Sequence, residues 1–161
     1  MTNSYTNSQR VFICLTGIWV GLMMAVGLLV PMTIFSFLTD KQVAGMVAGQ
    51  IFKNAGIISI IFGMSLLLFA NTLVRRELKQ FKLIRWCLLG TIVLSMIGNF
   101  IIQPWMAALR ENTLSEGFPV LLSSKAQLFQ TLHGVSSSIF LVELSLLIFV
   151  FWRSTKIESQ Y

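Results

Sequence analysis

The chain has few charged residues. Asp, Glu, Lys and Arg make up 11% of its 161 residues, whereas 55% are hydrophobic and the mean hydropathy is +0.79. A soluble domain carries roughly 25% charged residues, so a soluble enzyme is nearly excluded. An intrinsically disordered chain is excluded as well, because this much apolar surface is not stable in water. The length allows one domain, and the composition places that domain in a membrane.

Histidine and cysteine are also scarce. His133 is the only histidine, and the two cysteines, Cys14 and Cys87, are expected at the cytoplasmic side of the membrane. A structural disulfide is not expected in that reducing compartment, and we interpret both as buried thiols. A zinc site needs both residue types at one depth, and His133 is expected in the opposite half of the membrane. We therefore expect no metal site and no cofactor.

Four long stretches of the chain carry no charge or a single one. Residues 11–39, 54–74 and 86–109 carry none, and residues 126–152 carry only Glu143. About 20 helical residues cross the hydrocarbon core of a bilayer, so each stretch can cross once. Spanning strands would alternate in polarity, and these stretches do not. The sequence predicts an all-α protein, an integral membrane four-helix bundle.

The predicted domain map has a polar N-terminal tail (1–10), a single transmembrane domain (11–152) and a polar C-terminal tail (153–161). The spanning helices are expected at about residues 11–34, 51–74, 86–108 and 126–152. An interfacial helical segment is expected at about 40–50, and it can continue straight into the second helix. Pro31 and Pro104 are expected to kink or end the first and third helices. A polar outer segment, residues 110–123, follows the third helix.

Basic residues gather between the second and third helices. They are Arg75, Arg76, Lys79, Lys82 and Arg85. By the positive-inside rule this connection is cytoplasmic, which places the N- and C-termini in the cytoplasm too. We expect these residues to contact anionic lipid, which explains the net charge of +6 without a nucleic-acid partner.

Small residues recur at four-residue spacing on two of the predicted helices. They are Gly17, Gly21 and Ala25 on the first helix, and Ser59 and Gly63 on the second. Small residues let membrane helices approach closely. The spacing predicts helix packing, within one chain, in a homo-oligomer or against another membrane protein.

Glu143 lies near the middle of the fourth predicted helix. An acid at that depth costs at least ~2.5 kcal/mol, and no Lys or Arg lies within any span to pair with it. It must be protonated, bonded to a polar neighbour, or paired with another subunit. Ser95 and Trp19 are expected at a comparable depth. Two interpretations stay open: a proton-carrying or cation-contacting acid, and a neutral carboxyl that bonds helices together.

Polar residues also gather in the outer half of the predicted bundle. The candidates are His133, Asn99, Gln103, Gln130, Ser136 and Ser137. Lone polar groups inside a membrane are costly, so these residues either line a water-accessible pocket or hydrogen-bond helix to helix. Several methionines lead toward His133, and thioethers favour Cu(I), but methionine more often fills irregular cores.

Several segments resemble one known family. Residues 17–21 (Gly-Ile-Trp-Val-Gly) and Pro31, Phe35, Gly45, Gly49 and Phe52 resemble the first half of the domain of unknown function 4149. Gln103-Pro104 and residues 129–137 resemble its second half. This family is related to the eukaryotic transmembrane protein 205. The resemblance implies a small multi-pass protein of the bacterial inner membrane, and it brings no established activity.

Two functional hypotheses follow. The first is a non-enzymatic assembly or accessory protein, which would contact a membrane protein partner through its small-residue faces and Glu143. The second is a carrier or binder of a small solute or cation, with copper as one candidate, through the outer pocket around His133. An intramembrane enzyme would need a second catalytic group at the depth of His133 or Glu143, and we expect no catalytic activity.

Overall fold

The structure is a computed structural model that describes residues 6–75, 78, 80–117 and 119–156. Its elements are α1 (Asn7–Phe37), α2 (Lys41–Arg75), α3 (Gln80–Ile97), the π-helical turn η1 (Gly98–Ile102), α4 (Gln103–Ser115), the 3-10 turn η2 (Val120–Leu122) and α5 (Ala126–Ser154). Helices α3 and α4 join through η1 into one long rod. Within the described residues, four helical rods are long and apolar enough to span a membrane. The predicted all-α four-helix architecture is confirmed.

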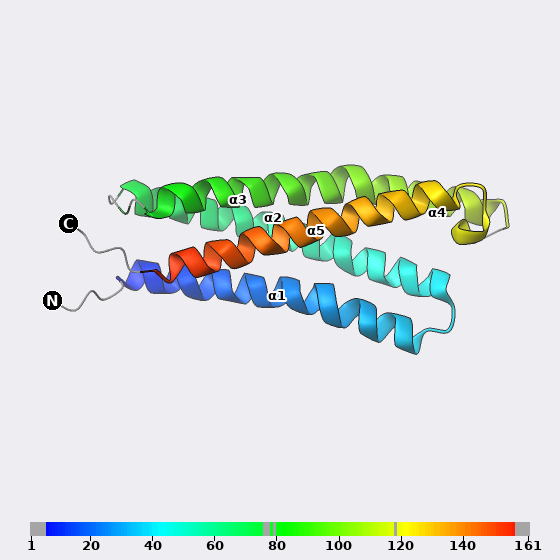
Figure 1. Ribbon diagram of the computed structural model, residues 1–161, viewed down its shortest axis with the longest axis horizontal. Helices are drawn as coiled ribbons and strands as arrows, with labels where there is room; N and C mark the ends of the chain where they lie inside the picture. The colour runs from blue at the N-terminus through cyan, green and yellow to red at the C-terminus, as the bar shows by residue number, and fades with distance from the viewer. Residues whose placement is uncertain (1–5, 76–77, 79, 118, 157–161) are drawn as a thin grey trace.

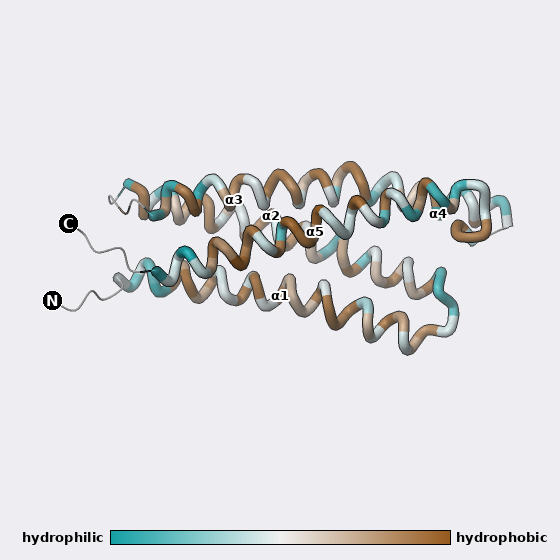
Figure 2. The backbone as a smooth tube through the Cα atoms, viewed as in Figure 1, coloured by the Kyte–Doolittle hydropathy of each residue, from teal (hydrophilic) through white to brown (hydrophobic). Residues whose placement is uncertain are grey.

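The four rods form an elongated bundle with both termini at one end (Figure 1). We call this the proximal end, and the opposite end, with the α1–α2 loop and η2, the distal end. Hydrophobic residues dominate along the rods, while hydrophilic residues gather toward the two ends (Figure 2). This distribution matches a bilayer whose hydrocarbon core surrounds the middle of the bundle. Which end faces the cytoplasm stays a prediction.

Helix boundaries differ from the predicted ones at both tails. Helix α1 begins at Asn7 because Thr6 and Gln9 form a capping box, in which each side chain accepts the other's backbone N–H. The predicted N-terminal tail of ten residues is therefore too long. Helix α5 continues to Ser154, two residues past its predicted end. Local caps of this kind satisfy N–H groups that a hydropathy pattern does not register.

The interfacial segment and the second span are one helix. Asp40 caps α2, because its Oδ1 accepts the backbone N–H groups of Gln42 at 2.8 Å and Val43 at 3.2 Å. From there α2 runs without interruption to Arg75. The expected alternative, in which this segment continues straight into the second helix, is the one observed.

Neither proline ends its helix, so the predicted breaks at Pro31 and Pro104 are wrong as helix ends. Pro31 lies inside α1, which continues to Phe37. Pro104 lies in the first turn of α4, directly after η1, where the N–H of Gln103 bonds to the carbonyl of Gly98. A π turn is wider than an α turn, so the proline ring is accommodated where an α-helix would have clashed with it.

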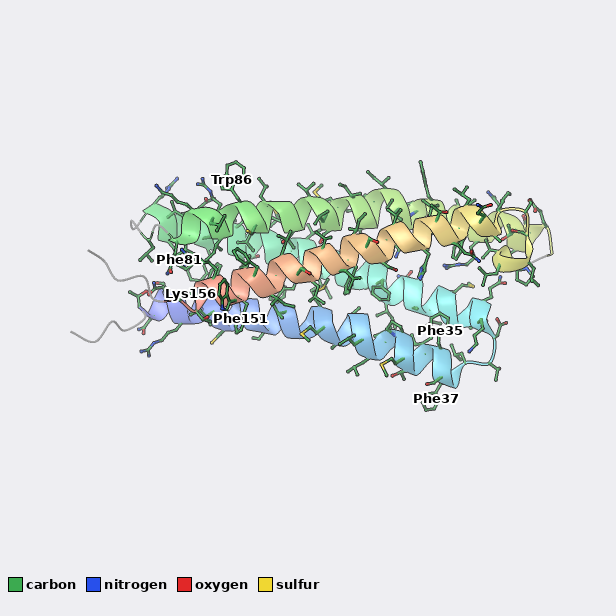
Figure 3. All side chains as sticks on the ribbon, viewed as in Figure 1. Phe35, Phe37, Phe81, Trp86, Phe151 and Lys156 are labelled. Carbon is green, nitrogen blue, oxygen red and sulfur yellow. The ribbon has the colours of Figure 1, made fainter. Side chains whose placement is uncertain are left out.

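The hydrophobic core is concentrated in the proximal half. Phe12, Phe81 and Leu147 are fully buried in its main cluster, and Phe12 meets the ring of Phe81 edge to face at 5.1 Å. Figure 3 shows Phe81 and Phe151 near this end and Phe35 and Phe37 at the distal end of α1. The distal half holds a much smaller cluster around Met106. Side chains therefore do not fill the space between the helices at the distal end.

Candidate functional site

A buried polar cluster joins all four rods near the middle of the bundle. It consists of Trp19 from α1, Ser59 from α2, Ser95 from α3 and Glu143 from α5, none of them more than 4% exposed. The hydroxyls of Ser59 and Ser95 each donate to Oε1 of Glu143 at 2.5 Å. The indole N–H of Trp19 donates to Oγ of Ser59 at 3.2 Å. Of the states predicted for Glu143, the structure shows the one bonded to polar neighbours of its own chain.

The cluster links the helices through one carboxyl group. Both serine hydroxyls lie within hydrogen-bond distance of the same carboxyl oxygen, Ser95 also lies 3.2 Å from Oγ of Ser59, and Ser59 accepts from Trp19. No second titratable side chain takes part in these bonds. Because an unsatisfied polar group in hydrocarbon costs several kcal/mol, the cluster specifies how the four rods align.

A cavity of about 870 Å³ opens in the distal half. Its walls come from α1, α2, α4, η2 and α5, which diverge toward that end (Figure 1). Phe52 and Phe140 both line it, and their rings pack edge to face at 5.5 Å. A Cβ added at Gly27 would lie 2.5 Å from the Phe140 ring, so α1 and α5 touch there and separate beyond it. The four residues of the buried polar cluster do not line this cavity.

Most of the predicted outer polar residues line this one cavity. They are Gln103, Gln130, His133, Ser136 and Ser137. The backbone carbonyl of His133 accepts the hydroxyl of Ser137, and the imidazole is exposed. The remaining walls are mostly apolar, from Leu28 and Phe35 on α1 to Leu144 on α5. The pocket alternative therefore matches this geometry better than bonds between helices.

Asn99 does not belong to the cavity wall. Its side chain is 6% exposed and lies against Gly56 of α2, where an added Cβ would be 3.1 Å from the amide nitrogen. That amide nitrogen has no hydrogen-bond partner in the described part of the chain. Grouping Asn99 with His133 on a shared pocket is the one part of the predicted polar set that the structure does not reproduce.

Arg110 lines the cavity, whereas the sequence predicted it at the start of a polar outer segment. It is half-buried on α4, lines the cavity, and holds its guanidinium carbon 5.5 Å from the centre of the Phe129 ring. Gly49 on α2 leaves room for it, since an added Cβ would lie 3.7 Å from Nη1. The signal available in the sequence was a lone Arg one turn beyond Met106 and close after Gln103.

The predicted packing residues divide into two groups. Gly63 is tightly enclosed, because an added Cβ would lie 2.7 Å from Ile92, and Gly17 faces the Phe151 ring at 3.1 Å. Ser59 belongs to the polar cluster, and Ala25 is half-buried. Gly21 is exposed, and a Cβ added there would meet no other described residue within 4 Å, so it does not serve close packing between the described helices. On α1 the close approach to α5 uses Gly17 and Gly27 instead.

Three of the five basic residues predicted to contact lipid lie at the proximal end. Arg75 and Lys82 are exposed there, and half-buried Arg85 donates to Oδ1 of Asn71 at 3.5 Å. Arg76 and Lys79 lie outside the described residues. Just after α5, Lys156 adds a further cation at this end (Figure 3), and its ammonium lies 3.7 Å from the centre of the Trp152 ring.

In the described part of the chain, cysteine and metal-ligating residues form no cluster. Cys14 and Cys87 are both free, and Cys14 is exposed, which corrects its interpretation as a buried thiol. Among the described residues no group of three or more His, Cys, Asp or Glu side chains could hold a metal ion. Met106 lines the cavity with His133, which gives one thioether and one imidazole.

Comparison with known proteins gives one match. The family model of a domain of unknown function (DUF4149) matches residues 14–114, which is more than half of the chain. The match begins at Cys14 in α1, covers all of α2, α3 and η1, and ends one residue before the end of α4. It ends before α5, so the resemblance over residues 129–137 lies outside it. No curated protein and no solved structure matches the chain.

Proposed function

The chain belongs to the DUF4149 family, and we propose that it is a non-enzymatic membrane protein that binds a small, largely apolar molecule in the distal cavity. The observation that carries the proposal is the gathering of the predicted polar residues around His133 on the wall of one mostly apolar cavity of about 870 Å³. Small-molecule sites are typically concave and apolar, about 300–1,000 Å³ in volume, with few polar groups to orient the ligand.

The charges at the cavity favour a neutral or anionic solute over a cation. Arg110 and Lys41 both line it, and the one acid, Asp40, already accepts two backbone N–H groups of α2. A copper ion would find the imidazole of His133 and the thioether of Met106 in a cavity that carries two cations. The cation form of the binding hypothesis, copper included, is therefore less well supported than the solute form.

Filling the cavity should remove the bound molecule. Gly45 lines the cavity, and a Cβ there would meet nothing within 4 Å, so Gly45→Leu places a side chain in the space without a clash. We expect native mass spectrometry of the protein, gently extracted from its own membrane, to show a bound mass for the wild type and none for Gly45→Leu. Gly21→Leu is the matched control, because Gly21 is equally open but lies outside the cavity. A mass that persists in Gly45→Leu, or is absent from the wild type, contradicts the proposal.

Truncating the histidine should weaken binding without affecting folding. His133 is exposed at the cavity wall, so His133→Ala removes one ligand hydrogen bond and little packing. We expect retention of the bound mass to fall about fivefold, from the ~1 kcal/mol net worth of a hydrogen bond. Gln127→Ala, on the same helix but outside the cavity, is the control. A His133→Ala protein that fails to accumulate in the membrane would make His133 a structural residue instead.

Assembly with another protein is the second candidate function. The specific observation in its favour is Gly21, which is exposed on α1 with open space around it and would admit a close helix from another chain. Glu143 no longer supports this candidate, since it is 4% exposed and bonded within the chain. The same native mass spectrum separates the two candidates, because an assembly protein carries a stoichiometric protein partner.

The proposal extends to location. We place the protein in a bacterial inner membrane with both termini in the cytoplasm. The family resemblance and the exposed basic residues Arg75 and Lys82 at the proximal end support this placement. Contact with anionic lipid headgroups at that end follows from the same charges.

A further inference from the structure

Three charged side chains line the distal cavity: Asp40, Lys41 and Arg110. The guanidinium of Arg110 is the one without a polar partner among the described residues. Lys41 donates to the carbonyl of Phe35 at 2.8 Å, and Asp40 caps α2. The salt bridge found in the described chain joins Lys125 to Glu116 and leaves Arg110 out. A guanidinium held against an apolar wall is poorly solvated, so an anion that enters the cavity gains a charge-assisted and often bidentate hydrogen bond.

The cavity is long enough for an acyl chain. Its lining on α5 extends from Phe129 to Leu144, which at 1.5 Å per residue is about 22 Å. One leaflet contributes half of a hydrocarbon core that is roughly 30 Å thick. The lining thus covers the depth of a lipid tail in one leaflet with several ångströms to spare for a headgroup.

The mouth of the cavity faces the region that lipid tails occupy. Leu28 on α1 and Leu141 on α5 both line the cavity and are 55% and 61% exposed. They lie on the two helices that separate beyond the Gly27–Phe140 contact (Figure 1). A molecule already dissolved in the bilayer can therefore enter sideways between α1 and α5 without leaving the membrane.

On α4 and α5, polar lining residues lie distal to the deepest apolar ones, in the order of the parts of a lipid molecule. Below the η2 residues that line the distal end, Arg110 comes first beside Phe129, then Gln130 and His133, and Phe140 and Leu144 lie deepest toward the middle of the bundle. A phospholipid presents its parts in this order, with an anionic phosphate, then ester carbonyls that accept hydrogen bonds, then a hydrocarbon tail. A soluble anion would match only the first part.

We propose that the distal cavity binds an anionic phospholipid of the adjacent leaflet, with the phosphate at Arg110, the ester region beside Gln130 and His133, and one acyl chain between α1 and α5. This inference rests on the proposed function and names the ligand of the same cavity. Arg110 acts by recognising the anion, and the apolar wall accepts the tail.

Photo-crosslinking of lipids tests the inference. The full chain is reconstituted in phosphatidylcholine vesicles with a minor fraction of phosphatidylglycerol that carries a diazirine on its acyl chain, and labelled peptides are identified by mass spectrometry. We expect labelling on the cavity walls of α1 and α5. Arg110→Gln should lower it about tenfold through loss of the charged hydrogen bond. Lys125→Gln, a distal cation already paired with Glu116, should leave it unchanged.

The other outcomes decide between this inference and the proposed function. Equal labelling by a phosphatidylcholine probe, unchanged labelling in Arg110→Gln, or displacement by inorganic phosphate alone overturns the anionic lipid. In those cases a bound mass that Gly45→Leu still removes keeps the distal cavity as a binding site. Wall labelling that persists in Gly45→Leu overturns both. Should Arg110→Gln fail to accumulate, Gly45→Leu retains Arg110 and gives the same readout.

Discussion

Gly63→Leu should separate α2 from α1 and α3. A Cβ at this position would lie 2.7 Å from Cγ1 of Ile92 and 3.3 Å from Cη2 of Trp19. Both neighbours are buried, Ile92 at 4% and Trp19 at 0% exposure, so neither can move aside without displacing its own surroundings. We expect the free energy of unfolding to fall by about 3 kcal/mol, at the upper end of overpacking costs. Unfolding in a titration with sodium dodecyl sulfate, followed by tryptophan fluorescence, measures the change.

Gly21→Leu is the matched control for this experiment. It makes the same substitution in a neighbouring helix, but nothing lies within 4 Å of the added Cβ. Leucine is also the better helix former by roughly 0.5–1 kcal/mol, so the control should unfold at the wild-type concentration or above. Equal losses in both variants would show that Gly63 is not specially enclosed. A loss in Gly21→Leu alone would indicate that α1 packs against a second chain.

The architecture was predictable from the sequence because it depends on a local property. A helix that crosses a bilayer must exclude charge for about 20 residues, and residues 11–39 and 54–74 show this directly. Helix ends depend on single contacts instead. The Thr6–Gln9 cap extends α1 backward, and the π turn before Pro104 lets the helix continue where proline alone predicts an end.

The cavity was partly predictable for a similar reason. Gln130, His133 and Ser137 recur at helical spacing within two turns of α5, so a single face brings them together. Asn99 and Gln103 lie four residues apart, but the π turn η1 contains Asn99 and ends directly before Gln103. A π turn has more residues per turn than an α turn, so it rotates Asn99 about the rod axis relative to Gln103, compared with a regular α-helix. Asn99 therefore meets Gly56 of α2, while Gln103 faces the cavity.

Arg110 and the Gly27–Phe140 contact needed the structure. An arginine after a charge-free stretch has the usual pattern of a helix end in water, and only the position of η2 and Phe129 encloses it. The approach of α1 to α5 depends on their crossing, which brings Gly17 to Phe151 and Gly27 to Phe140. A four-residue repeat along one helix carries no information about the partner helix.

Glu143→Lys should prevent stable folding, whereas Glu143→Gln should not. Lysine would place a cation in the middle of the bundle. The four predicted spans contain no acid other than Glu143 itself, so nothing there would pair with it. We expect a loss of about 3 kcal/mol in the free energy of unfolding, the cost of an uncompensated charge at that depth. Glutamine keeps an oxygen that can accept the hydroxyls of Ser59 and Ser95, so its loss should stay below about 0.5 kcal/mol.

The comparison of the two variants separates a structural from a charged role for the carboxyl. If the cluster acts through hydrogen bonds alone, the detergent titration gives Glu143→Gln a wild-type midpoint, with the Trp19 environment unchanged because its indole still donates to Ser59. Ser59→Ala then becomes the more damaging conservative change, since it removes a donor to Glu143 and the acceptor of Trp19 at once. If Glu143→Gln loses as much as Glu143→Lys, the protein needs the ionisable carboxyl itself. The proton-carrying interpretation of Glu143 would then replace the structural one.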